Sequence, residues 1–424
     1  MESTIPAVAR RTSVGGNFAW TSAGNAVYAA CQWGIVSVLA KLGSAELVGQ
    51  YALGVAVATP VMALAQLNLR SVLATDVDQR HDFRDYRDLR AASLVVAMLI
   101  VTVLALTGHR GDDRLIVFIT GLLLAVEWMS DIYLGLLQQH ERMNRMAISL
   151  SVRGVLALAA LAGGVAITGS LAIGLVAMLG VRLLVLFLYD SGPAVRDCSG
   201  NSPRLPFHQR LREQGKIFKI AFPLGLVLMI TSLTTNLPRY FIAHQLGNHA
   251  LGIFSAIASL TAAASLLVNA LGQAATPRLA RMFVAGDHRG FGKLSFQLAL
   301  MGLGLGVAGM AASLVLGRFV LTLFFRAEYA AHVDLLVLLS LAAGMGFVAS
   351  LLGYAITAGR RFREQLPIQI ASVSAAALTA FLLVPHYGLT GAAIACTVGP
   401  IVQTLGELIV LRSALNCIRP QGTR

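Results

Sequence analysis

Apolar residues in this chain form long continuous blocks that are separated by short polar turns. Hydropathy predicts about twelve blocks, each near the ~20 residues that a helix needs to cross a hydrocarbon core of ~30 Å. The predicted spans are 17–40, 47–68, 91–108, 115–138, 146–168, 170–190, 218–242, 250–275, 293–316, 333–357, 366–384 and 388–411. Because the blocks do not alternate apolar with polar residues, they favour helices and exclude a membrane barrel. We therefore predict an all-α polytopic membrane protein. The stretch 317–332 fits an extended ninth span, an interfacial segment or the start of the tenth span.

A sequence pattern occurs twice in the chain. The stretch from Leu42 to Asp76 reads Leu-Gly, a short polar gap, Leu, a glycine, an aromatic residue and an apolar run rich in small residues. A second copy begins at Leu246, and Arg278 closes it where Arg70 closes the first. The chain is therefore predicted to contain two related halves.

The longest hydrophilic connector runs from Ser191 to Gly215, between the sixth and seventh spans. It predicts an N-terminal six-helix bundle at 1–190, a cytoplasmic connector at 191–216 and a C-terminal six-helix bundle at 217–424. An even number of spans in each half gives both halves the same orientation, and we expect the substrate site in the cleft between them.

Composition and charge agree with a membrane protein and indicate its orientation. Of the 424 residues, 56% are hydrophobic and only 12% are charged, and the mean hydropathy is +0.73. Most of the 33 Lys and Arg residues fall in segments on one side, and those on the other side are Lys41, Arg110, Arg114, Arg318 and Arg326. This asymmetry predicts that both termini are cytoplasmic. No removable signal peptide is expected. Basic loops that face anionic lipid headgroups explain the net charge of +13 better than nucleic-acid binding does.

No motif for enzymatic chemistry is visible in the sequence. A phosphate-binding loop, a metal-binding His-Glu pattern and a nucleophile elbow are all absent from it. We therefore predict neither an enzyme nor a bound cofactor or metal.

Charged residues within the spans are the strongest candidates for function, because each costs at least ~2.5 kcal/mol to insert unless it has a partner or a wet cavity. Glu127 and Asp131 share one face of the fourth span. Asp131 and Arg153 lie equally far from the turn at Arg142, so a fixed ion pair between them is the first interpretation. The alternative is functional: Glu127 or Asp131 exchanges protons or a cation, while Arg153 and Arg182 line a cavity that attracts anions.

Polar side chains also form stripes on the leading span of each half. The first stripe consists of Asn17, Thr21, Asn25, Tyr28 and Gln32, and the second of Ser232, Thr235, Asn236 and Arg239. Each stripe suits interhelical hydrogen bonds, but two matching stripes favour a shared polar cavity. Arg239 and Glu407 lie near span ends, where extension of the side chain to the interface is the simpler interpretation.

The hydrophilic loop from Thr75 to Arg90 has Asp and Arg residues at helical spacings, such as Arg84 with Asp88. It predicts a solvated cytoplasmic helix.

Four motifs resemble those of polysaccharide or O-antigen flippases, within the superfamily of multidrug, oligosaccharidyl-lipid and polysaccharide exporters. They are LGSAELVGQYALGVAVATP, LNLRSVLATD, ATPRLARMFVAGD and LTGAAIACTVG. The resemblance implies a multi-pass inner-membrane protein that moves an undecaprenyl-pyrophosphate-linked oligosaccharide to the outer leaflet through a cationic central cavity, by alternating access. Arg70 and Arg278 match the basic residues that close the second and eighth spans, and we expect structural or headgroup roles for them.

The partners expected from this resemblance are the lipid-linked oligosaccharide, membrane lipids and glycan-assembly enzymes, without nucleic acid. The proposed substrate-binding residues are Arg153, Arg182, Arg239, Asn17, Asn25, Gln32 and Asn236. One alternative is a cation-coupled multidrug or small-solute antiporter of the same architecture, although three arginines within spans fit an anionic ligand better. The other is a membrane-embedded glycan polymerase or ligase, which the short outer loops disfavour.

Overall fold

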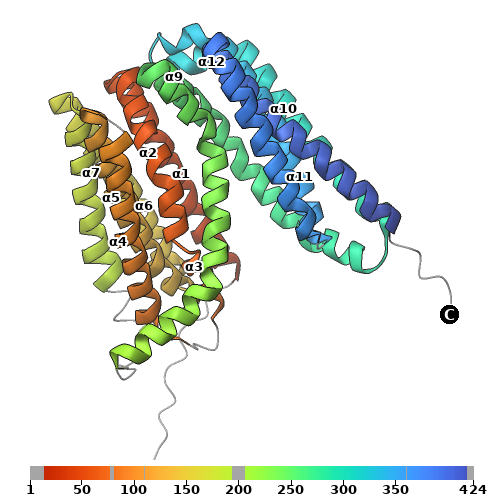
Figure 1. Cartoon of the computed structure of the whole chain (residues 1–424), viewed down its shortest axis with the longest axis horizontal. Helices are drawn as coiled ribbons and strands as arrows, with labels where there is room; N and C mark the ends of the chain where they lie inside the picture. The colour runs from red at the N-terminus through yellow and green to blue at the C-terminus, as the bar shows by residue number, and fades with distance from the viewer. Residues whose placement is uncertain (1–13, 77–80, 109, 193–205, 360, 418–424) are drawn as a thin grey trace, which may run out of the picture. The chain divides into compact units, whose positions relative to one another are not determined.

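The computed structural model describes residues 14–76, 81–108, 110–192, 206–359 and 361–417. Within these ranges the chain is helical apart from short turns and contains no strand, which confirms the all-α class. Figure 1 shows the helices. In chain order they are α1 (Val14–Leu42), α2 (Ala45–Ala65), α3 (Leu69–Thr75), α4 (Phe83–Gly108), α5 (Asp112–Gln139), α6 (Met143–Thr168), α7 (Leu171–Val185), the π-helix η1 (Leu186–Asp190), α9 (Phe207–Val284), α10 (His288–Phe324), the 3₁₀ helix η2 (Tyr329–His332), α11 (Val333–Ala358) and α12 (Phe362–Cys417).

Ten helical stretches among the described residues are long and apolar enough to cross a membrane. The polytopic class is therefore confirmed, whereas the count of twelve spans is not. Two of the stretches, in α9 and α12, are 55 and 50 residues long, and each of these two helices contains two predicted spans. Each of these helices is kinked at a glycine with positive φ, Gly247 (81°) in α9 and Gly388 (57°) in α12. A side chain disfavours this backbone conformation, so each glycine breaks its helix near the boundary between two predicted spans.

Local sequence explains where several helices begin and end. Asp112 and Asp113 lie in the first turn of α5, where negative charge is favourable. The Asp287 side chain accepts a hydrogen bond of 2.8 Å from the Gly290 N–H and so caps the start of α10. Gly169, in the left-handed conformation, ends α6. From its start α10 continues into the stretch that hydropathy left open, as far as Phe324.

The chain folds into two compact units. Unit 1 contains Met1–Gly43 and Leu53–Leu233, and unit 2 contains Ser44–Ala52 and Thr234–Arg424. Residues 193–205 of the predicted connector lie outside the described residues. The division into 1–190, 191–216 and 217–424 therefore stays a prediction.

In unit 1, α1 packs closely along α6 through small residues. A Cβ atom added at Gly24 would lie 2.6 Å from the Cα of Ala147, and one at Gly154 would lie 3.2 Å from the Cβ of Cys31. The first part of α9 also belongs to this unit, because Ile217 is buried there in one apolar cluster with α3 and α4. This arrangement brings side chains of α1, α3, α4, α5, α6 and α7 into one interior.

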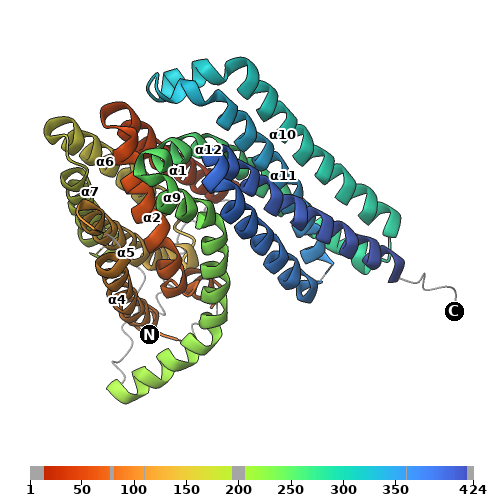
Figure 2. The same cartoon turned by 45° about the horizontal axis from the view of Figure 1, so that its top comes forward.

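Unit 2 has α11 at its centre. Leu351 and Ala355 have no exposed surface and pack in one cluster with residues of α9, α10 and α12. Gly306 of α10 and Gly344 of α11 lie back to back, so that a Cβ atom on Gly306 would be 2.4 Å from the Cα of Gly344. Figure 2 shows α10, α11 and α12 running side by side.

The two copies of the repeated pattern meet inside unit 2, at two glycines in matching positions. A Cβ atom at Gly49 of α2 would lie 1.8 Å from the carbonyl oxygen of Asn248. One at Gly252 of α9 would lie 1.8 Å from the carbonyl oxygen of Ala45. We call this reciprocal contact the glycine seam. Since the two backbones leave no room for a side chain, packing explains why the second glycine of the pattern recurs.

Candidate functional site

The charged residues predicted within the spans of unit 1 lie in one group of ion pairs and hydrogen bonds, whose two parts meet on α5 at Glu127 and Asp131, one turn apart. We call it the N-terminal charge network, and its members are Tyr28, Gln32, Arg70, Arg90, Glu127, Asp131, Ser149, Arg153, Arg182 and Asp190. Seven helical elements contribute to it, namely α1, α3, α4, α5, α6, α7 and η1, so its geometry depends on the packing of the whole unit.

At its centre is an ion pair between α5 and α7. The Nη1 atom of Arg182 lies 2.6 Å from Oε2 of Glu127, and it also donates to the carbonyl oxygen of Leu123 at 3.2 Å. The side chain of Arg182 is only 4% exposed and that of Glu127 17%. Removal of one partner from such a pair leaves an uncompensated buried charge and typically costs about 3–5 kcal/mol.

Helix α1 contacts this pair through the C-terminal part of its polar stripe. The Tyr28 hydroxyl donates a hydrogen bond to Oε1 of Glu127, and Nε2 of Gln32 donates to the Tyr28 hydroxyl at 2.9 Å. The N-terminal part of the stripe does not reach this pair. The Asn17 carbonyl oxygen accepts a hydrogen bond of 2.9 Å from the Thr21 hydroxyl, and Asn25 is exposed. The structure thus brings Gln32 to the charged residues and leaves Asn17 and Asn25 outside the network.

The predicted ion pair between Asp131 and Arg153 is wrong. Asp131 pairs instead with Arg70 of α3, whose Nη1 lies 2.8 Å from Oδ1, and with Arg90 of α4 at 3.9 Å. Arg153 places its guanidinium 5.2 Å from the centroid of the Tyr28 ring. Equal distance from the turn fixes the depth of two residues in a hairpin but not the direction in which each helix face points.

Arg70 and Arg90 belong to this network, although the sequence analysis proposed a role only for Arg70. Arg70 also donates from Nε to Gln138 at 3.1 Å and contacts the Met146 sulfur at 3.2 Å, so it joins α3 to α5 and α6. The repeated arginine at the close of the second span was the available signal. Arg90 has no exposed surface, yet hydropathy placed it in the loop that precedes the third span.

A third carboxylate, which the sequence analysis missed, lies at the end of η1. Asp190 is fully buried, and its Oδ1 accepts a hydrogen bond of 2.6 Å from the Ser149 hydroxyl of α6. The network therefore holds four guanidinium groups and three carboxylates, a surplus of one positive charge. Such an arrangement suits a switchable ion-binding site or the attraction of an anion.

The candidate residues of unit 2 form a separate group. Nη1 of Arg239 donates to Oδ1 of Asn236 at 2.7 Å, one turn apart on α9. Arg239 is half-buried and Asn236 is buried. The expectation that Glu407 extends to the interface is wrong, because it is 2% exposed and accepts a hydrogen bond of 3.0 Å from Gln403.

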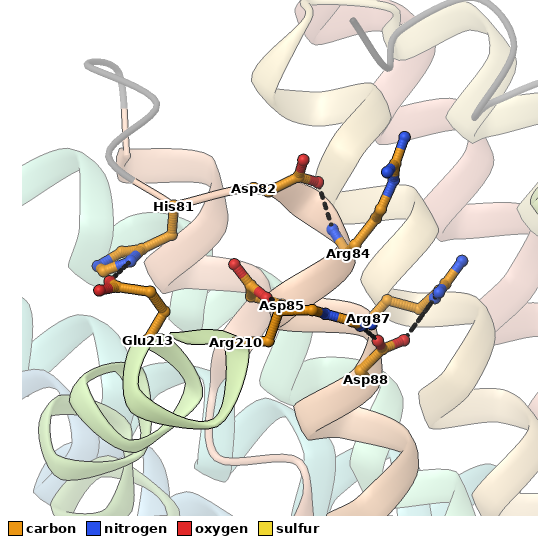
Figure 3. A network of polar contacts seen from close by, with 8 residues as sticks. All are labelled: His81, Asp82, Arg84, Asp85, Arg87, Asp88, Arg210 and Glu213. Carbon is orange, nitrogen blue, oxygen red and sulfur yellow. Dashed lines mark hydrogen bonds and ion pairs between the residues drawn. The ribbon is translucent and has the colours of Figure 1, made fainter. Parts of the chain in front are cut away.

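The predicted helix of the loop 75–90 begins only at Phe83, and one face of it is not solvated. Figure 3 shows why: the start of α9 covers this face with Arg210 and Glu213. Arg210 pairs with Asp88 and lies 3.8 Å from the buried Asp85, while Glu213 lies 3.1 Å from His81. We call these five residues the connector clasp. Asp88 therefore pairs with Arg210 and with its neighbour Arg87 instead of the predicted Arg84.

Comparison with known proteins identifies the family to which this chain belongs. The model of the polysaccharide biosynthesis protein family matches residues 14–283, more than half of the chain. The chain belongs to this family. The resemblance to polysaccharide flippases that the sequence motifs indicated is thereby confirmed.

One relative of this family member is the capsular polysaccharide biosynthesis protein CapF of Staphylococcus aureus. It is 24% identical over 391 residues, which cover 92% of this chain and 97% of CapF. An inward-facing multidrug resistance MATE family transporter of the MOP superfamily has the same fold, with a TM-score of 0.70 and 14% identity over 95% of this chain and all of that one. The lipid II flippase MurJ, in its inward closed conformation, also has a TM-score of 0.70, with 11% identity over 94% of this chain and 89% of that one. The family member therefore has the fold that these two proteins share.

Proposed function

We propose that this protein moves a lipid-linked oligosaccharide with a polyprenyl-pyrophosphate anchor from the cytoplasmic to the outer leaflet of the inner membrane, by alternating access and without enzymatic chemistry. The observation that carries the proposal is the family match over residues 14–283. It is supported by a full-length relative named for capsular polysaccharide biosynthesis and by a fold shared with a protein described as a lipid II flippase.

Among the arginines, Arg239 is the best candidate for contact with the pyrophosphate. Arg182 is neutralised by Glu127, and Arg153 is only 2% exposed. Arg239 is half-buried, and its hydrogen-bond partner Asn236 is a neutral amide, so its charge stays available. A charge-assisted hydrogen bond to phosphate is roughly twice as strong as a neutral one.

The remaining candidates receive roles according to their positions. Asn17 and Asn25 at the start of α1 are proposed to contact sugar hydroxyls, whereas Arg153, Arg182 and Gln32 act through the N-terminal charge network. Glu127 is proposed as the ion-coupling residue and Asp131 as a structural partner of Arg70. Both termini are proposed to be cytoplasmic, and glycan-assembly enzymes are proposed as partners.

A leaflet-specific assay tests the proposal. The purified protein is reconstituted in vesicles with a fluorescent lipid-linked oligosaccharide, and the glycan on one face is measured with a membrane-impermeant quencher. We expect translocation with the natural protein, a loss of about tenfold with Arg239→Gln, and partial recovery with Arg239→Lys. Exposed Arg318 provides the control Arg318→Gln, which should translocate normally. Absence of translocation by the natural protein would refute the proposal.

The second candidate function is a cation-coupled multidrug or small-solute antiporter. It is favoured by the fold shared with the multidrug transporter and by Glu127, an acid within a span that is only 17% exposed. The same vesicles decide between the two, because drug efflux driven by a cation gradient, without glycan movement, would support the antiporter.

A further inference from the structure

Asp190 and Arg153 are two buried, oppositely charged groups that each lack part of their hydrogen bonding. Oδ2 of Asp190 makes no hydrogen bond to any described residue, and the same holds for Nε and Nη1 of Arg153. Arg153 is 2% exposed and Asp190 fully buried. A buried polar group that lacks a hydrogen bond in such a position is destabilising.

The two groups lie within reach of one another through α6. Ser149 and Arg153 are four residues apart on α6, which places their Cβ atoms about 5–6 Å apart on one face. The Ser149 hydroxyl holds the Asp190 carboxylate at 2.6 Å. The Asp190 carboxylate therefore lies beside the face of α6 that carries Arg153, and the two charged groups interact electrostatically.

On its other side, Arg153 faces the centre of the charge network. Its guanidinium lies over the ring of Tyr28, whose hydroxyl is bonded to Glu127. Glu127 and Asp190 both interact electrostatically with Arg153. The guanidinium thus interacts electrostatically with two acids without a hydrogen bond to either, while Glu127 is already held by Arg182 and Tyr28.

We propose that Asp190 is a positioning residue and the second acidic partner of Arg153. When Glu127 loses its negative charge by binding a proton or a cation, Arg153 leaves the Tyr28 ring and pairs with Asp190. Around Arg153, the charged and titratable groups are Glu127 of α5, Arg182 of α7, Asp190 of η1 and the Tyr28 hydroxyl of α1. Asp190 also faces Ser130 and Tyr133 of α5 and its neighbour Tyr189. The movement removes the cation–π contact between α6 and α1, and so loosens α1.

This inference rests on the proposed transport function, but it is tested first without substrate. The chain has three tryptophans, Trp20 and Trp33 on α1 and Trp128 next to Glu127 on α5. Intrinsic fluorescence of the purified protein, measured as a function of pH, therefore reports on the surroundings of the network. The variants are Asp190→Asn, Asp190→Glu and Arg153→Gln, and the control is Asp334→Asn, which changes an exposed acid in the first turn of α11.

We expect a pH-dependent fluorescence change in the natural protein that Asp190→Asn and Arg153→Gln each abolish, that Asp190→Glu retains and that the control leaves intact. Transport should fall about tenfold with Asp190→Asn, equivalent to about 1.4 kcal/mol, and the double variant should lose no more than the single ones. Thermal unfolding in detergent confirms that each variant is folded.

The same fluorescence change with and without Asp190, or no change in the natural protein, would overturn the inference. If the fluorescence depends on Asp190 while no lipid-linked glycan moves, the charge exchange is supported and the proposed substrate is wrong. If glycan moves normally with Asp190→Asn, the transport function is supported and the positioning role of Asp190 is wrong.

Discussion

The glycine seam leads to the sharpest prediction about this protein. In Gly252→Ala, the new methyl group would lie 1.8 Å from the carbonyl oxygen of Ala45, whereas real Cβ atoms essentially never approach a heavy atom closer than 3.0 Å. The obstacle is backbone, which cannot turn away as a flexible side chain does. The start of α2 and the second segment of α9 must therefore separate.

The expected cost follows from the geometry. Overpacking by a methyl group typically costs 1–3 kcal/mol, and a backbone obstacle puts this variant near the upper value of about 3 kcal/mol. Alanine itself favours a helix over glycine by up to about 1 kcal/mol. The matched control is Gly309→Ala in α10, where the new methyl group meets nothing within 4 Å. We expect Gly252→Ala to be less stable than this control by about 2–4 kcal/mol.

Reversible denaturation in detergent micelles, followed by circular dichroism, measures the difference. Gly49→Ala should behave like Gly252→Ala, because its methyl group meets the carbonyl oxygen of Asn248 at the same 1.8 Å. The double variant should cost less than the two single costs together, since one separation relieves both clashes. Equal stability of Gly252→Ala and Gly309→Ala, or full additivity of the pair, would refute the reasoning.

Two further predictions concern the polar contacts of unit 1. Glu127→Gln and Arg182→Met should each lower the free energy of unfolding by about 3–5 kcal/mol, because each leaves a buried charge unpaired. The double variant should be more stable than either single variant in the same denaturation assay. A double variant that is less stable than both would count against the ion pair. Arg210→Ala should destabilise the protein by about 1 kcal/mol, and by less at high salt, since it removes the clasp contacts with Asp88 and Asp85. The control Lys216→Ala removes only an exposed pair with Glu213 and should change stability by less than about 0.5 kcal/mol. Equal effects of the two variants would contradict a specific role for the clasp.

The fold class was predictable from the sequence because span length and continuous hydropathy follow directly from the thickness of the bilayer. The repeated glycine of the pattern was visible as well, and the seam now gives it a packing reason. The count of spans was less accessible. A kink such as that at Gly247 merges two helical segments into α9, and hydropathy does not report backbone angles.

The sequence predicted which charged residues form the candidate site better than it predicted which of them pair with each other. Glu127, Arg153 and Arg182 were chosen because charges within spans are expensive, and they do meet in one buried network. The partner of Asp131 was wrong because hairpin depth does not fix the rotation of a helix about its axis. Asp190 was missed because it lies at the last residue of a span, where an acid is usually interpreted as interfacial.

The start of α9 belongs to unit 1, whereas the rest of this helix belongs to unit 2. Residues 207–233 follow the hydrophilic connector in sequence, yet they pack with the helices that precede it, through Ile217 and the connector clasp. A polypeptide cut between Gly192 and Pro206 would leave this helix on the second fragment and its binding surface on the first. Two separately synthesised pieces would thus each carry one side of the apolar contact at Ile217 and of the connector clasp.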